Sequence, residues 1–119
     1  MESLTEQSFR VKVDTELRDG FLRIGEIYLP GEKADEILVN SYLCHPLGAN
    51  DNLSGVVVAI ELSRLPKRHF SYRLAIWPET IGAITYISKN KERLEHTVGG
   101  VQLSVCGDGA KVKIDETYY

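Results

Sequence analysis

The sequence predicts an α/β domain in which strands and helices alternate along the chain. Three short apolar runs have the length of strands, and two longer stretches between them have apolar residues at helical spacing. The runs cover residues 37–44, 71–78 and 98–106, and the helical stretches cover residues 53–65 and 81–94. Because such alternation builds βαβ units, we expect a three-layer αβα sandwich around a mixed, partly parallel sheet.

Length, composition and charge limit the number of domains and the classes of function that the protein can have. Its 119 residues are enough for one domain, which we take as residues 1–119, and 43% of them are hydrophobic, as in globular proteins. A net charge of -3 at pH 7 gives no basic surface for nucleic acid or an anionic membrane. No apolar run approaches the roughly 20 residues of a membrane helix. The N-terminus lacks the basic and apolar regions of a secretory signal, and two cysteines make no disulfide framework, so we expect a cytoplasmic protein.

The first thirty residues predict an N-terminal β-hairpin. Residues 9–14 alternate apolar and polar side chains, which is typical of a half-buried strand. Asp19-Gly20 is a common turn pair, and residues 21–29 read as a second strand that Pro30-Gly31 ends. We therefore expect the two strands to pair with one another within residues 1–30.

The remaining elements follow in order. Residues 37–44 are almost continuously apolar, as in a central strand covered on both faces. The helix over 53–65 presents one apolar side and ends at Pro66. The helix over 81–94 has a basic second half, and residues 111–114 read as a weak edge strand.

Polar residues follow two neighbouring strands at the point where each ends. His45 and Asp51 lie in one loop, and Glu79 follows the next strand. Ligands of α/β sheets bind beyond the carboxyl ends of the strands, so these side chains should open onto the same edge. An imidazole and a carboxylate are a common zinc-binding pair, and a nearby glutamate can accept a proton from water. The pattern favours metal-assisted hydrolysis.

Each of these residues also has a purely structural interpretation, and the sequence leaves both open. Asp51 precedes a helix, where aspartate is a favoured N-cap. His45 at a strand end is compatible with a hydrogen-bonded structural role, and Glu79 with a charge that complements a helix dipole. Cys44 and Cys106 are interpreted as small buried apolar residues.

Three motifs resemble a known family. They are Cys-His-Pro at 44–46, Ala-Asn-Asp-Asn-Leu-Ser-Gly at 49–55 and Pro-Glu-Thr-Ile-Gly at 78–82. They resemble the zinc aminopeptidases that include bacterial leucyl aminopeptidases, and more narrowly a bacterial and archaeal aminopeptidase-like domain family, some members of which are associated with polysaccharide-biosynthesis loci. The resemblance runs from about residue 19 to residue 108. It implies the phosphorylase/hydrolase-like core of the zinc peptidases.

The same resemblance implies roles for individual residues. His45 and Asp51 would bind zinc, and Glu79 would be the catalytic base. Asn50 and Asn52 would hold the loop, with Thr80 close to the metal in a second shell. The substrate would be a peptide or a small amide.

The sequence departs from the family in ways that point to an incomplete site. Thr80 stands where the two-zinc enzymes have a second, metal-binding glutamate, and Leu47 where they have an aspartate that orients the histidine. Residues 103–106 offer no acidic ligand, and the family's last histidine would lie beyond residue 119. We therefore expect a single zinc ion, and a chain that is a fragment or a shortened homologue.

Two functions remain in view at this point. The first is a zinc-dependent, aminopeptidase-like hydrolase, weak or inactive as this short chain. The second is a non-catalytic binding or assembly module that keeps the peptidase fold. A third alternative is a homodimer that completes the site or covers an exposed sheet edge with its partner.

Overall fold

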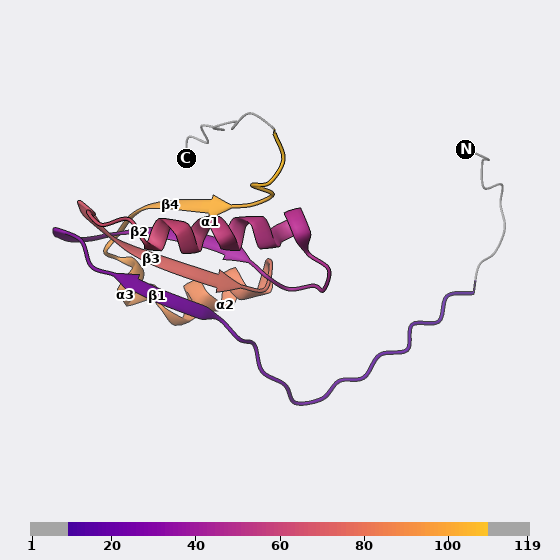
Figure 1. The fold of residues 1–119 in the computed structure, drawn as a ribbon. Helices are drawn as coiled ribbons and strands as arrows, with labels where there is room; N and C mark the ends of the chain where they lie inside the picture. Colours follow the sequence, from indigo (N-terminus) through magenta and orange to yellow (C-terminus); the bar gives the residue numbers. More distant parts are fainter. Residues whose placement is uncertain (1–9, 110–119) are drawn as a thin grey trace, which may run out of the picture.

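The structure, a computed structural model, describes residues 10–109 and contains a four-stranded mixed sheet (Figure 1). The strands are β1 (Gly25–Leu29), β2 (Lys33–Tyr42), β3 (Phe70–Trp77) and β4 (Thr97–Leu103). Their order in the sheet is β1-β3-β2-β4. β2 runs parallel to both β3 and β4, whereas β1 runs antiparallel to β3. The predicted α/β class with a partly parallel sheet is confirmed.

The helices connect the parallel strands. A short π-helical segment, η1 (Ala49–Leu53), leads into α1 (Ser54–Ser63) between β2 and β3. The single helix expected over residues 81–94 is instead α2 (Ile81–Lys89) followed by α3 (Lys91–Leu94). Asn90 separates them with φ -125° and ψ 28°, outside the helical region. Within residues 10–109, no helix is both long and apolar enough to cross a membrane.

Alternate residues of the strands face the two helical layers. Leu74 of β3 lies beside Ala59 and Ile60 of α1 on one face of the sheet. Its neighbour Ala75 belongs to the cluster formed with Trp77 and Tyr86 of α2 on the other face. The Trp77 and Tyr86 rings lie 5.0 Å apart between centroids. The sheet is therefore the middle of three layers, as Figure 1 shows for α1 and α2.

The predicted N-terminal hairpin is wrong for the part of it that the structure describes, residues 10–30. Residues 10–24 form no strand, and β1 begins only at Gly25. β1 pairs with β3, about fifty residues further along the chain, rather than with a local partner. Val11 and Val13 are 80% and 73% exposed, so their alternation marks no buried face. Phe9 and the expected strand at 111–114 lie outside the described residues.

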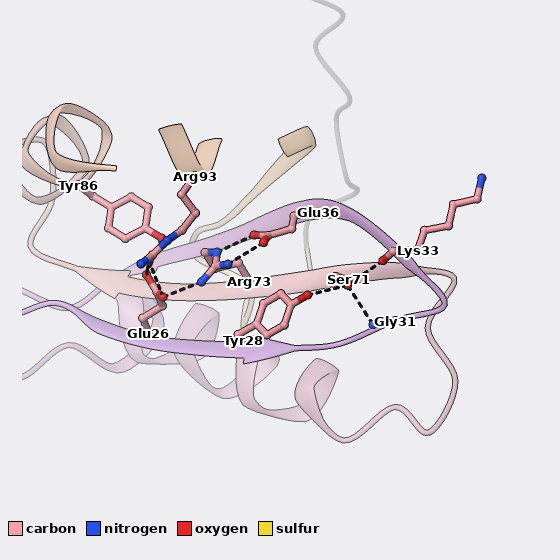
Figure 2. A network of polar contacts seen from close by, with 9 residues as sticks. All are labelled: Glu26, Tyr28, Gly31, Lys33, Glu36, Ser71, Arg73, Tyr86 and Arg93. Atoms are coloured by element: carbon pink, nitrogen blue, oxygen red, sulfur yellow. Dashed lines mark hydrogen bonds and ion pairs between the residues drawn. The ribbon is translucent and has the colours of Figure 1, made fainter. Parts of the chain in front are cut away.

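A buried charge network between the sheet and α2–α3 was not predicted. Arg73 of β3 is 8% exposed and makes a bidentate pair with Glu36 of β2, with both N–O distances 2.6 Å. Its third contact is with Glu26 of β1 at 2.7 Å. Glu26 also accepts hydrogen bonds from Arg93 and Tyr86 (Figure 2). The network joins three strands to the helical layer.

These contacts shift the pKa values of Arg73, Glu26 and Tyr86. The bond to Glu36 raises the pKa of Arg73, against the opposing effect of burial. Burial by itself would raise the pKa of Glu26, but hydrogen bonds from Tyr86 and Arg73 and the arginine charges lower it on balance. Burial and the hydrogen bond to Glu26 raise the pKa of Tyr86 to about 12.

Ser71 ties the turn between β1 and β2 to β3. Its hydroxyl accepts hydrogen bonds from Tyr28 O–H and Gly31 N–H and donates to the Lys33 carbonyl, as Figure 2 shows. A Cβ on Gly31 would lie 2.2 Å from the Phe70 carbonyl oxygen, so only glycine fits here. These bonds fix where β2 starts.

We expect the stabilising effect of Tyr86 to disappear at high pH. Its pKa in the folded protein, about 12, lies above the ordinary value of 10. The stabilisation is therefore complete below pH 10 and is lost as the pH rises from 10 to 12. Urea unfolding of the wild type and Tyr86→Phe should show a stability gap that shrinks across this window. A gap that stays constant up to pH 12 would contradict the assignment.

Candidate metal centre

The carboxyl ends of the three parallel strands meet at one edge of the sheet, here called the rim. Tyr42 of β2 is in register with Trp77 of β3, and Ser41 with Leu103 of β4. The loops that follow, residues 43–48, 78–80 and 104–107, therefore leave the sheet at this edge. This is where ligands bind in α/β sheets.

His45 and Asp51 lie together at the rim. The distance between His45 Nε2 and Asp51 Oδ2 is 3.5 Å, and the side chains are 46% and 57% exposed. His45 Nδ1 lies 3.2 Å from the Pro46 carbonyl oxygen, a suitable acceptor for its proton. With Nδ1 donating there, Nε2 carries a lone pair that faces a carboxylate. A cation between the two groups would relieve this opposition.

The spacing suits two ligands of one ion. Zinc binds nitrogen and oxygen at about 2.0–2.2 Å in a tetrahedron, which puts two ligand atoms about 3.4 Å apart. The observed 3.5 Å fits this value. Residues 10–109 contain no cluster of three or more His, Cys, Asp or Glu side chains placed to bind a metal. The described chain thus offers two ligands, one fewer than the three of a usual catalytic zinc site.

The structure does not support the capping interpretation of Asp51. The N-cap position of α1 is Leu53, and no side chain caps that helix. Asp51 lies inside η1 with φ -106° and ψ 92°, and the Asp51–Asn52 peptide bond is cis. Its Oδ1 accepts a hydrogen bond of 2.5 Å from Tyr42 O–H. The carboxylate is held by a tyrosine and faces a histidine rather than a helix end.

Asn50 and Asn52, on either side of Asp51, tie its loop to the loop after β4. Asn52 is 2% exposed; its amide nitrogen donates to Ser41 Oγ and to the Leu103 carbonyl, and its Oδ1 accepts from Val105 N–H. Asn50 Oδ1 accepts from Gly107 N–H at 2.7 Å. Because a buried carboxamide with all these partners is costly to disturb, the two asparagines fix the backbone on both sides of Asp51.

Glu79 and Thr80 follow β3 at the rim, and both are exposed. The hydrogen bond to Asp51 is the largest cause that raises the pKa of Tyr42, and the charge of Glu79 adds to it. Glu79 therefore lies within electrostatic reach of the Tyr42–Asp51 pair. Thr80 has φ 57° and ψ -71°, and Ile81 N–H donates to the Glu79 carbonyl across it, which is a γ-turn.

Backbone strain is concentrated at the rim. Three non-glycine residues in the described chain have positive φ, and each lies in one of the three rim loops: Leu47 at 60°, Thr80 at 57° and Val105 at 46°. Such conformations cost of order 1–3 kcal/mol each and occur preferentially at functional sites. Together with the His45–Asp51 pair, they make this edge the candidate functional site of the described chain.

Two further findings concern residues that the sequence interpretation misjudged or missed. Cys44 and Cys106 are exposed free thiols, not buried, because both lie in rim loops beyond the strand ends. Tyr42 and Ser104, whose hydroxyls lie 3.1 Å apart, were not singled out. The sequence does contain a signal for Tyr42: a tyrosine at the end of an apolar strand predicts a hydrogen-bond partner beyond the strand, because a buried tyrosine O–H needs one.

The fold and the rim define a peptidase-like α/β domain. A crystal structure of a protein from Clostridium acetobutylicum, described as a candidate peptidase, matches with a TM-score of 0.65 and 44% identity, over 72% of this chain and 21% of that one. The chain belongs to the family DUF4910, a domain of unknown function, which matches residues 5–118.

A curated relative comes from the same organism. It is named for polysaccharide biosynthesis and for an aminopeptidase-like domain, and is 42% identical over 111 residues, which are 90% of this chain and 25% of the relative. The chain thus spans about a quarter of that protein's length.

Proposed function

We propose that this chain carries part of a single-zinc site of an aminopeptidase-like hydrolase that acts on peptide or related amide bonds. The supporting observation is the 3.5 Å approach of His45 Nε2 and Asp51 Oδ2 at the rim. These two side chains would bind the ion, and a third ligand would come from outside the described residues. The names of the relatives, which span far more sequence, agree with this class.

The other rim residues have roles that follow from their positions. A bound zinc ion would lower the pKa of a coordinated water to about 7 and polarise a carbonyl group. Glu79, exposed beside the pair, would accept the proton of the attacking water. Asn50 and Asn52 would keep Asp51 in place, and Thr80 would set the direction of Glu79 through its γ-turn. Two exposed free thiols also favour a reducing, cytoplasmic location.

A non-catalytic assembly module is the second candidate, favoured by one observation. Each helical layer exposes an apolar side chain: Val57 of α1 is 50% exposed and Ile84 of α2 is 65% exposed. Exposed apolar surface often marks an interface. In this reading the chain would associate with a second copy, and it would remain folded without metal.

Metal content separates the two candidates. Purified without chelator, the wild-type chain should hold close to one zinc ion, measured by elemental analysis. His45→Ala should weaken zinc binding at least tenfold in a chelator competition, because one of two ligands is lost. Glu79→Gln should retain zinc, since we assign that residue to the water rather than to the ion.

The matched control is His69→Ala. His69 also faces a carboxylate, with 3.3 Å between Nδ1 and Glu32 Oε2, but it lies outside the rim. This variant should bind zinc as the wild type does. A folded wild-type chain that takes up no zinc, or equal losses in both histidine variants, would argue for the assembly module.

A further inference from the structure

We propose that Tyr42 is a positioning residue that holds Asp51 through Oδ1, so that Oδ2 is presented to His45 and to a metal ion. This inference rests on the proposed zinc site for its last step. Its first step, the fixed orientation of Asp51, concerns the metal-free protein and can be tested separately.

The ring of Tyr42 is a rigid support. Tyr42 is the last residue of β2 and is 9% exposed. Its ring belongs to the core cluster with Ala75, Trp77 and Tyr86. Because the ring is packed on these residues, its hydroxyl occupies a defined place at the strand end, facing the loop that carries Asp51.

The hydroxyl has two partners from two different loops. It donates to Asp51 Oδ1 at 2.5 Å, and the oxygen of Ser104 lies 3.1 Å away. Since the Tyr42 proton is used by Asp51, Ser104 donates to the Tyr42 oxygen. A chain of polar contacts thus runs from Ser104 after β4, through Tyr42, to Asp51 and His45.

This contact decides how the carboxylate can act. The Asp51 side chain is 57% exposed, so without a partner it would sample several rotamers. A hydrogen bond to a carboxylate is charge-assisted and strong enough to select one of them. The hydrogen bond uses one lone pair of Oδ1, whereas Oδ2 faces His45 Nε2 at 3.5 Å, so Oδ2 is the oxygen better placed for a shared cation. Hydrogen bonds of this kind orient carboxylate ligands at metal sites.

Tyr42→Phe tests the inference, because it removes the hydroxyl and keeps the packed ring. In the metal-free wild type, the three-bond couplings to Asp51 Cγ measured by NMR should report one χ1 rotamer. In Tyr42→Phe they should show averaging over rotamers. Zinc affinity should fall about tenfold to hundredfold, the usual effect of losing a residue that orients a ligand.

Tyr86→Phe is a closely matched control. Tyr86 is also buried, at 3% exposure, and also donates to a carboxylate, Glu26, at 2.6 Å. It lies in the same cluster but does not contact Asp51, so it should leave both the Asp51 couplings and zinc affinity unchanged. The comparison separates positioning from a general loss of stability.

The outcomes distinguish the two proposals. A single Asp51 rotamer that survives in Tyr42→Phe overturns the positioning role, whatever the protein does with zinc. An averaged rotamer in the wild type also overturns it. A wild type with one rotamer, lost in Tyr42→Phe, supports the role even when no zinc binds, and in that case only the proposed metal function fails.

Discussion

Arg73→Met is expected to destabilise the fold by about 3–5 kcal/mol, the usual cost of removing one partner of a buried ion pair. The guanidinium joins Glu36 of β2 and Glu26 of β1, which lie on either side of β3 in the sheet. Glu36 is 7% exposed, so without Arg73 its charge would be left buried beside a thioether. A typical domain has only about 5–15 kcal/mol of stability, so much of it would be lost.

Urea unfolding at pH 7 measures the effect, with Arg64→Met as the control. Arg64 pairs with Glu61 one turn away at 2.9 Å, but both side chains are at least 60% exposed. Such a pair contributes at most about 1 kcal/mol. If Arg73→Met cost no more than Arg64→Met, the Glu36 charge would have to be solvated in the native state.

A double variant shows whether burial of the charge is the cause. Glu36→Leu together with Arg73→Met removes both charges and leaves apolar side chains in their place. Because the desolvation of both ions is then avoided, the double variant should be more stable than Arg73→Met alone. A double variant less stable than the single one would mean that the unpaired Glu36 charge is not what destabilises Arg73→Met.

The parallel part of the fold could be predicted because its signals are local. Each of the strands β2, β3 and β4 contains a short apolar run, and the segments between them have helical spacing. Alternation of this kind constrains topology strongly, since consecutive parallel strands need a crossover. The end of α1 near Pro66 was visible for the same reason.

The N-terminal region and the charge network could not be predicted because their partners are distant in sequence. Residues 10–14 alternate like a strand, but alternation does not specify a partner, and here they have none in the sheet. Arg73 meets carboxylates 37 and 47 residues away, on strands whose neighbours are set by the whole fold. The break at Asn90 was visible in principle, as asparagine is a poor helix former.

At the rim, His45 and Asp51 could be predicted from the sequence, but Tyr42, which holds Asp51, could not. His45 and Asp51 could be paired from the sequence because only five residues, with Gly48 at the centre, lie between them, and the structure places His45 Nε2 3.5 Å from Asp51 Oδ2. The zinc ion itself stays a prediction. Tyr42 could not be identified in the same way, because a tyrosine at the end of an apolar strand is typical of a core residue. The hydrogen bond between its hydroxyl and the Asp51 carboxylate is visible only in the structure.

Gly55→Ala is expected to destabilise the protein by about 2 kcal/mol, although alanine usually favours a helix over glycine by about 1 kcal/mol. Gly55 lies in the first turn of α1, where the helix touches β4. A Cβ there would lie 2.5 Å from the Leu103 carbonyl oxygen and 2.8 Å from Asn52 Oδ1. Backbone and buried amide cannot move aside cheaply, so α1 would have to shift away from β4.

The shift of α1 away from β4 should also displace the rim loops, so the variant tests whether the contact between α1 and β4 holds Asp51 in place. The Leu103 carbonyl accepts hydrogen bonds from Ser41 and Asn52, so displacing it would loosen the loop that carries Asp51. Gly25→Ala is the control, because its Cβ would lie 3.9 Å from the nearest atom, the Ile76 carbonyl oxygen. Urea unfolding and amide exchange at residues 49–53 should change in Gly55→Ala alone. If Gly55→Ala proved as stable as the wild type, the helix would have room to move, and the close contact of α1 with β4 would not be what holds Asp51 in place.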